Sequence, residues 1–136
     1  MVIKFDYEYE DQSYFGKIYR PIAEVSIKTP KAEIWTKLIM IVDTGADFSI
    51  LPYHFVYDLR ISLEKECIKS NTTGVGGSQT IFLYKHPLKI KLADQEKNIP
   101  IAFFDNDEIP ALMGRQGFLE IFDVEFLKSH AVVFKS

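Results

Sequence analysis

Hydrophobic and polar residues alternate with a period of two along much of this chain of 136 residues. In the segment 3–9, aromatic and aliphatic residues alternate with Lys and acidic residues, which is typical of a β-strand with one buried face. Further strand-like segments cover residues 14–28, with a bend near Pro21, and residues 34–42, 80–84, 88–92, 99–104, 124–127 and 131–134. Aromatic residues form 14% of the chain, and they favour strands as well.

Helical patterns are few and short. Pro52 can occupy the first turn of a helix that runs to about Arg60, and residues 115–122 carry apolar side chains at helical spacing. Strands and helices do not alternate regularly, so we expect an all-β, mostly antiparallel fold, closed or folded over like a barrel, with one or two short helices. No internal repeat or linker occurs, and residues 1–136 are expected to form one domain.

Charge and composition exclude several classes of protein. The chain has 16 basic and 19 acidic residues, a net charge of −3, without the basic cluster that nucleic-acid binding needs. It contains no apolar run of membrane-spanning length, and its acidic N-terminal segment does not resemble a signal peptide. Cys67 has no partner for an internal disulfide. We therefore expect a cytoplasmic protein that binds neither nucleic acid nor membranes.

The segment 38–42 consists of five apolar residues and leads directly into Asp43 and a turn that contains Gly45. Such a run predicts a strand buried on both faces. Burial of an ionised carboxylate is costly, so Asp43 should either accept several hydrogen bonds or share a proton with another acid. A simple turn in which the carboxylate caps the loop is the alternative.

Three motifs in a fixed order favour a catalytic role. Residues 43–47 (Asp-Thr-Gly-Ala-Asp) resemble the active-site motif of the retropepsin-like aspartic proteases. Residues 73–81 (Thr-Gly-Val-Gly-Gly-Ser-Gln-Thr-Ile) look like the family's flap, and residues 111–115 (Ala-Leu-Met-Gly-Arg) are similar to its apolar, Gly, Arg motif. The resemblance extends from about residue 34 to residue 126. It implies the family's barrel-like fold and no metal or other cofactor.

The resemblance assigns roles to the active-site loop. Asp43 would be catalytic, as one of two aspartates that share a proton and activate water. Gly45 would allow the tight turn, Thr44 would bond to the partner loop, and Ala46 would leave room for the substrate backbone. Because the sequence has a single Asp-Ser/Thr-Gly triplet, the second aspartate must come from a second chain in a homodimer.

The resemblance also implies an ion pair between Asp47 and Arg115 beneath this loop. Removal of one partner of a buried pair costs about 3–5 kcal/mol, so Arg115→Ala is expected to weaken folding or dimerisation before it affects chemistry. Two separate surface charges are the alternative.

Four residues, Gly74, Val75, Gly76 and Gly77, would form the flap tip. A phosphate-binding loop is disfavoured because no Gly-Lys-Ser/Thr follows and the segment continues as a strand. A plain flexible hairpin is the other alternative. The candidate substrate-pocket residues, each of which could equally belong to the core, are Phe48, Ile81, Phe82, Leu112 and Met113.

Other chemistries have little support in the sequence. The three histidines are scattered and Cys67 is alone, so no zinc motif is present. The acidic segment 105–108 lacks the glycine and the distant glutamate of a calcium loop and is expected to be a solvated loop.

The predicted function is hydrolysis of an extended polypeptide by a homodimeric aspartic endopeptidase. The alternatives are a non-catalytic dimerisation or peptide-binding module on the same fold, and a monomer that dimerises only when concentrated. The terminal segments 3–9 and 131–134 are candidates for a sheet between subunits, whereas an additional N-terminal hairpin could instead cover a sheet edge.

Overall fold

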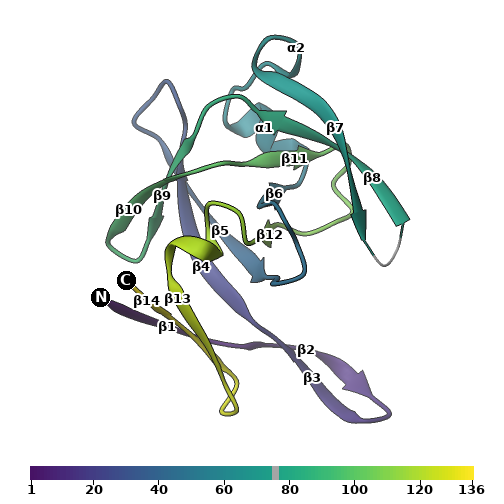
Figure 1. Cartoon of the computed structure of the whole chain (residues 1–136), viewed down its shortest axis with the longest axis vertical. Coiled ribbons are helices and arrows are strands. Elements are labelled where there is room, and N and C mark those ends of the chain that lie inside the picture. Colours follow the sequence, from purple (N-terminus) through teal and green to yellow (C-terminus); the bar gives the residue numbers. More distant parts are fainter. Residues whose placement is uncertain (75–76) are drawn as a thin grey trace.

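The computed structural model describes residues 1–74 and 77–136 (Figure 1). Its strands are β1 (Val2–Asp6), β2 (Glu8–Ser13), β3 (Gly16–Arg20), β4 (Ile22–Lys28), β5 (Trp35–Val42), β6 (Ile50–Leu51), β7 (Cys67–Gly74), β8 (Gly77–Tyr84), β9 (Leu88–Leu92), β10 (Gln95–Ile99), β11 (Ala102–Phe104), β12 (Leu112–Met113), β13 (Asp123–Leu127) and β14 (Ala131–Lys135). The helices are α1 (His54–Asp58), α2 (Leu63–Glu66) and the 3-10 helix η1 (Leu119–Ile121). The predicted all-β fold with short helices is confirmed.

The largest sheet has the strand order β10-β9-β4-β5-β12-β6-β11-β8-β7 and curls into a half-barrel (Figure 1). Most neighbours are antiparallel, but β12 runs parallel to β5, and β11 runs parallel to β6. This arrangement places the end of β5, and therefore Asp43, within the sheet rather than at its edge. The predicted folded-over sheet is confirmed.

The core lies inside the curl of this sheet. On β4, Ala23, Val25 and Ile27 are fully buried, whereas the residues between them are at least partly accessible, as the period of two predicts. Each fully buried aliphatic side chain contributes about 1.5–3 kcal/mol of transfer free energy. The largest fully buried side chains are Phe103, Phe118, Phe134, Ile27, Met40, Leu51, Leu59, Ile81, Leu88, Ile90, Leu92 and Ile99.

The two ends of the chain pair with each other. In the sheet β1-β14-β13, β14 has β1 on one side and β13 on the other, so both of its edges are used within the chain. β14 therefore has no free edge for a strand of a second chain, whereas β1 and β13 pair on one side only among the described residues, so a sheet between subunits stays a prediction. The ends meet at the left of Figure 1.

The N-terminal segment forms two strands rather than the single strand predicted for residues 3–9. It breaks at Tyr7, whose backbone N–H donates to the carbonyl of His130 at 2.8 Å and whose ring stacks on the His130 ring. Beyond this point β2 pairs with β3 as a separate hairpin, which covers no edge of the other two sheets in the described part of the chain. The predicted bend near Pro21 separates β3 from β4.

Several short elements differ from the prediction. Strand β7 was not expected because its mostly exposed sequence has no apolar alternation, and α2, capped by Ser62, was also missed. The predicted helix at 52–60 shortens to α1. Within residues 115–122, the predicted helix is only a turn followed by η1, with Phe118, Leu119 and Phe122 buried.

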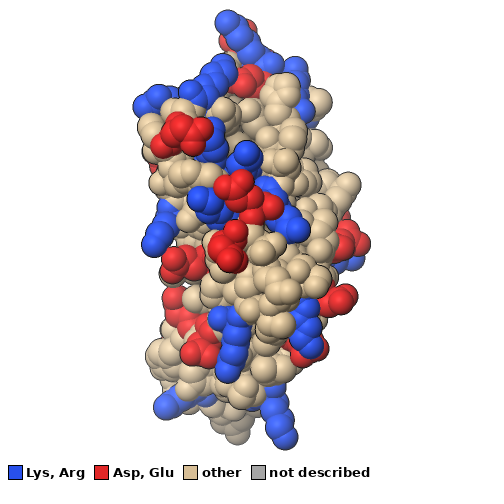
Figure 2. Space-filling model, turned by 90° about the vertical axis from the view of Figure 1, so that its left-hand side faces the viewer, with Lys and Arg blue, Asp and Glu red and all other residues tan. Residues whose placement is uncertain are grey.

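One face of the molecule carries charges of both signs. On the face at the left of Figure 1, basic and acidic side chains are interspersed (Figure 2). Among the helices in the described ranges, none is long and apolar enough to span a membrane.

Candidate active site

Asp43 begins a tight turn directly after β5. Its backbone N–H donates to the carbonyl of Met113 at 3.0 Å, which fixes it beside β12. Its Oδ1 accepts a hydrogen bond from Gly45 N at 2.9 Å, and Ala46 N donates to the Asp43 carbonyl at 3.2 Å. The turn proposed as the simpler alternative is therefore present, but it uses only one carboxylate oxygen. Asp43 remains partly accessible to solvent, so its carboxylate is available for chemistry.

The segment after β12 supports the active-site loop from the other side. Arg115 N donates to the Ala46 carbonyl at 2.9 Å, and Gln116 N donates to the Asp47 carbonyl at 2.9 Å. Gly114 N donates to the hydroxyl of Ser49, a fully buried residue, at 3.0 Å. Two of the sequence motifs, far apart in the chain, therefore hold each other in place.

Ser49 was missed as a site residue. Its only sequence signal is a hydroxyl group between Phe48 and Ile50 in an otherwise apolar stretch. A buried hydroxyl requires a hydrogen-bond partner, and this one accepts the Gly114 N–H that would otherwise be unpaired. Ser49 is thus a positioning residue for the loop.

Asp47 and Arg115 are in contact, as the resemblance implied. Arg115 Nη2 forms an ion pair with Asp47 Oδ1. The side chain of Asp47, however, is 63% exposed and that of Arg115 is 50% exposed, so in the single chain this pair is on the surface and not buried. The large cost expected for its removal is therefore not supported, because solvent screens an exposed pair.

We now expect Arg115→Ala to lower the free energy of unfolding by no more than about 1 kcal/mol. The backbone bond from residue 115 to Ala46 does not depend on the side chain and should persist. Urea denaturation of the dilute chain measures the change. A loss of about 3 kcal/mol or more would show that the pair behaves as a buried one.

A cavity of about 290 Å³ lies over the active-site loop. Its floor includes Asp43, and residues of the β7–β8 hairpin, where Gly74 pairs with Gly77, line the opposite side. The lining residues are Asp43, Gly45, Ala46, Asp47, Ile50, Thr72, Thr73, Gly74, Gly77, Gln79, Phe104, Ile109 and Leu112. Val75 and Gly76, predicted to lie at the flap tip, are outside the described residues. Thr44 is exposed on the loop.

Among the predicted pocket residues, only Leu112 lines this cavity. Met113 and Ile81 are fully buried, and Phe48 lines a different cavity beside Ser49. Phe82 follows Ile81 on β8, so its side chain points to the opposite face of the strand, where it packs against the main core near Tyr53. These four side chains therefore do not line this cavity in the single chain, and their assignment to a substrate pocket stays a prediction.

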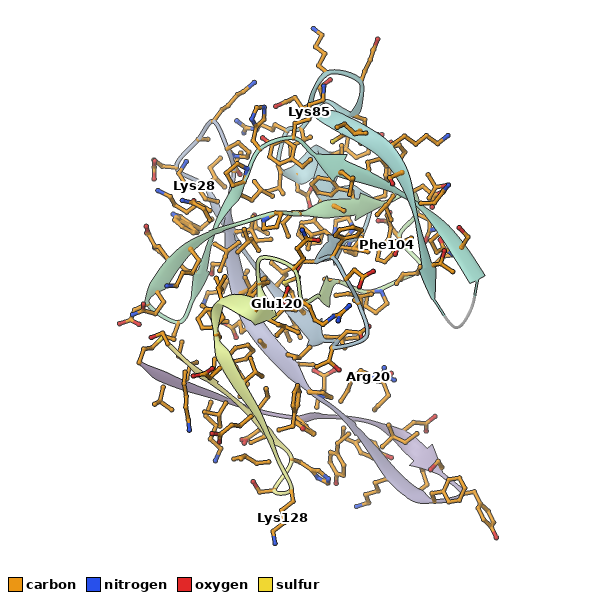
Figure 3. The ribbon with its side chains drawn as sticks, viewed as in Figure 1. Arg20, Lys28, Lys85, Phe104, Glu120 and Lys128 are labelled. Atoms are coloured by element: carbon orange, nitrogen blue, oxygen red, sulfur yellow. The ribbon has the colours of Figure 1, made fainter. Side chains whose placement is uncertain are left out.

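The apolar wall of the cavity instead comes from residues that sequence reasoning did not select. Ile50 on β6 and Phe104 on β11 line the cavity and belong to one small core cluster with the fully buried Ile81. Figure 3 labels Phe104. Ile109 contributes from the loop before β12. The only sequence signal for Ile109 is an apolar residue placed between an acidic segment and Pro110.

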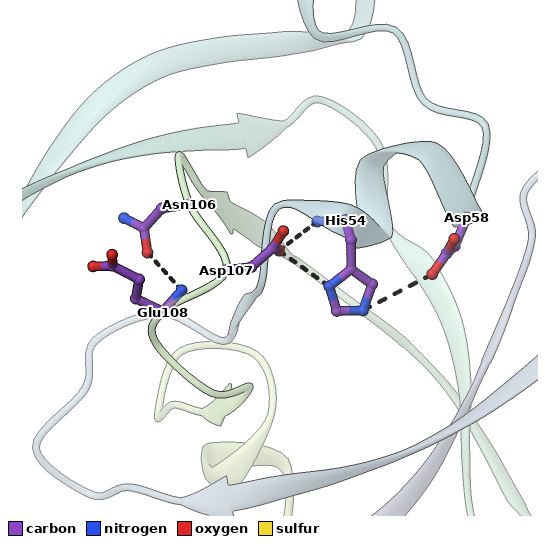
Figure 4. Close-up of polar contacts among 5 residues, drawn as sticks. All are labelled: His54, Asp58, Asn106, Asp107 and Glu108. Carbon is purple, nitrogen blue, oxygen red and sulfur yellow. Dashed lines mark hydrogen bonds and ion pairs between the residues drawn. The ribbon is translucent and has the colours of Figure 1, made fainter.

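The loop that carries Ile109 is anchored to α1 (Figure 4). Asp107 Oδ1 accepts from His54 N at 2.8 Å and lies 3.0 Å from His54 Nδ1, while Tyr53 N donates to the Asn106 carbonyl at 3.1 Å. The hydrogen bond from the His54 backbone lowers the pKa of Asp107. The acidic loop is thus exposed, as expected, but tied to the fold.

Asp107→Ala is expected to accelerate hydrogen exchange at the His54 amide by about tenfold or more, because that amide loses its acceptor. The control Asp105→Ala removes only a contact to the neighbouring Asn106 side chain and should not affect His54. Exchange measured by NMR compares the two variants. Equal exchange in both would contradict the anchoring role.

The same bond predicts a direction for the pH dependence of stability. The pKa of Asp107 is lower in the folded than in the unfolded chain, so its ionised carboxylate contributes to the free energy of unfolding. This contribution is fully present above the ordinary aspartate pKa and is lost as pH falls through the lowered pKa of the folded chain.

In the described ranges, no three His, Cys, Asp or Glu side chains lie close enough to hold a metal ion. Cys67 is buried, and this burial raises the pKa of its thiol, which favours the unreactive neutral form. Cys67 therefore does not suggest a second reactive centre.

The sequence profile of the aspartyl protease family matches residues 36–116, which include all three motifs. A retropepsin-like aspartic protease from Rickettsia conorii has a similar structure, with a TM-score of 0.64 at 18% identity over 98% of each chain. The EIAV protease, solved with the inhibitor HBY-793, has a TM-score of 0.51 at 26% identity over 71% of this chain and 82% of its own. A comparison with curated protein sequences gave no match.

Proposed function

The chain belongs to the aspartyl protease family, with the retropepsin-like fold, and we propose that it is a homodimeric aspartic endopeptidase. The observation that carries this proposal is the position of Asp43. It lies on the floor of a cavity that faces a glycine-containing hairpin, and the sequence has no second Asp-Ser/Thr-Gly triplet. The second carboxylate would be Asp43 of another copy.

In this mechanism, the two carboxylates share one proton. The ionised one removes a proton from water, whose oxygen attacks the carbonyl carbon of the substrate, while the other carboxyl group protonates the carbonyl oxygen. The carboxyl group that holds the proton from water then gives it to the amide nitrogen, the other carboxylate takes a proton from a hydroxyl group of the tetrahedral intermediate, and the carbon–nitrogen bond breaks, which restores one shared proton. The bond from Gly45 N to Asp43 Oδ1 orients the carboxylate for this role.

The substrate would be an extended polypeptide beneath the β7–β8 hairpin, which acts as the flap. We propose that Ile50, Phe104, Ile109 and Leu112 receive an apolar side chain, because they form the apolar part of the cavity wall. Ala46 would leave space for the substrate backbone. Thr44, exposed in the single chain, would bond across the dimer.

Residues 1–136 would act as one catalytic domain. The single, buried Cys67 suits a reducing compartment such as the cytoplasm, where we place the enzyme. A non-catalytic peptide-binding or dimerisation module would use the same cavity, so activity must be measured directly.

The test is cleavage of an unfolded protein substrate at several pH values, with and without an inhibitor that mimics the tetrahedral intermediate. We expect cleavage at mildly acidic pH, where a pair of carboxyl groups retains one proton, and loss of cleavage with the inhibitor. Substrate that binds without being cut at any pH would favour the non-catalytic module.

A further inference from the structure

The hairpin formed by β2 and β3 extends away from the rest of the molecule, on the same side of Figure 1 as the ends of β7 and β8 at Gly74 and Gly77. We refer to residues 8–20 as the arm. Its strands pair only with each other among the described residues, and nearly all of β2 is exposed. At about 3.3 Å per residue, strands of this length reach roughly 17–20 Å. A two-stranded hairpin without further packing is marginally stable in water, so this arm is expected to need a covering partner.

The base of the arm is held firmly. The ring of Tyr19 stacks on that of His130, with ring centres 4.4 Å apart, and Tyr9 packs edge to face against Tyr19 at 5.8 Å. Arg20 Nε lies 3.3 Å from Glu10 Oε2 (Figure 3 labels Arg20). The stacking of Tyr19 on His130 therefore ties the base of the arm to the turn before β14, while the other two contacts lie within the arm.

The arm tip presents two aromatic side chains to solvent. Tyr14 is 98% exposed and Phe15 is 97% exposed, and their rings pack edge to face at 5.6 Å. The Ser13 hydroxyl orders the turn, because it donates to the Gly16 carbonyl at 2.8 Å and accepts from Phe15 N at 3.2 Å. Two adjacent aromatic residues that are ordered and almost fully exposed are typical of an interface anchor.

The position of the arm identifies its partner. Val42 N donates to the Pro21 carbonyl at 2.9 Å, and Ile22 pairs with Ile41, so the arm begins opposite Asp43 in the register of β4 and β5. In the proposed enzyme the second Asp43 must approach to about 3 Å, which brings the second chain directly against this region. The arm starts beside Asp43 and extends roughly 17–20 Å on the side of the molecule that the second chain would cover. It must therefore run along the second chain.

We propose that the arm is a dimerisation clasp, whose tip residues Tyr14 and Phe15 dock on the body of a second copy of this chain. The inference rests on the proposed function, because that function requires the second copy. It also explains how the dimer is held although β14 has both edges used within its own chain. By the twofold symmetry of such a dimer, each chain would contribute one arm and receive the other.

The test is sedimentation equilibrium of the wild-type chain and of the double variant Tyr14→Ser/Phe15→Ser over a range of concentrations. Both side chains are exposed, so the double variant should fold like the wild type. We expect its dimer dissociation constant to rise by about tenfold or more, with unchanged cleavage per dimer at saturating chain concentration. The control Tyr57→Ser removes a 68% exposed aromatic side chain from α1 and should leave the dissociation constant unchanged.

The outcomes separate this inference from the proposed function. Equal dissociation constants for the wild type and the double variant, with cleavage retained, would overturn the clasp but not the enzyme. A dimer that needs the arm but does not cleave would support the clasp alone. If the wild type stays monomeric, the clasp is overturned. Wild-type binding to lipid vesicles that the double variant loses, with equal dimer constants, would also overturn the clasp and assign the tip to a membrane.

Discussion

Asp43→Asn is expected to abolish peptide-bond hydrolysis while the chain remains folded. In a homodimer this single change removes both carboxylates, and general acid and base catalysis alone contributes about 10²–10⁴ in rate. We therefore expect cleavage to fall by about 10⁴ or more. The amide oxygen of Asn can still accept the hydrogen bond from Gly45 N that Asp43 Oδ1 accepts, so the loop should be preserved.

Initial cleavage rates of an unfolded protein substrate measure this loss, with thermal unfolding of both proteins as the control for folding. Asp105→Asn is the matched control, because it replaces a carboxylate that is exposed on the loop before β12, outside the cavity lining and outside the contact with His54. Cleavage by the Asp43→Asn variant at the wild-type rate would refute the catalytic role of Asp43.

Gly114→Ala is expected to cause the largest loss of stability. A Cβ atom at this position would lie 2.1 Å from the carbonyl oxygen of Phe48 and 3.0 Å from that of Ala46. Both are backbone atoms, so no side-chain rotation can relieve the overlap, and the two supporting segments must separate. We expect the free energy of unfolding to fall by about 3 kcal/mol or more, and the active-site loop to be displaced.

Urea denaturation measures this change. The matched control is Gly74→Ala, since a Cβ atom there meets no other atom within 4 Å. The control should alter the free energy of unfolding by less than about 1 kcal/mol. Equal free energies of unfolding for the Gly114→Ala and Gly74→Ala variants would contradict the close packing of the two motifs.

The position of Asp43 could be predicted from the sequence because its signals are local. An apolar run ending in an acidic residue and a glycine predicts a strand followed by a turn, and β5 and its loop have this form. The predicted burial on both faces is wrong, because Met40 and Val42 are buried but Ile39, on the other face of the strand, is 51% exposed. The alternation on β4 and the bend near Pro21 depend equally on near neighbours in the chain. Predictions of this kind agree with the structure.

Contacts between distant segments could not be predicted in this way. The bond from Gly114 N to Ser49 and the exposure of the ion pair between Asp47 and Arg115 depend on how two loops meet. Apolar character and closeness to a motif do not determine the face of the strand on which a side chain lies. Ile81 and Phe82 therefore lie outside the cavity lining of the single chain, whereas Ile109, placed by the anchor between Asp107 and His54, lies in it without a clear sequence signal.

The N-terminal segment shows a further limit of periodicity. Its alternation continues through Tyr7 into β2, so the sequence indicates one strand, yet the chain leaves the sheet at that point. The Tyr7 N–H still bonds to the carbonyl of His130, in register with the β1–β14 pairs, but β14 begins at the turn from β13, so the segment beyond Tyr7 has no strand of this sheet beside it. Alternation identifies which residues share a face of a strand, but not which strand will be its neighbour.

Mixing of subunits tests whether two chains form one active site. Wild-type chain is equilibrated with about a ninefold excess of the Asp43→Asn chain, so that about one in ten wild-type chains finds a wild-type partner. The account predicts that cleavage per wild-type chain then falls to about one tenth of its value without the variant. Undiminished cleavage per wild-type chain, in a mixture shown to exchange subunits, would contradict it.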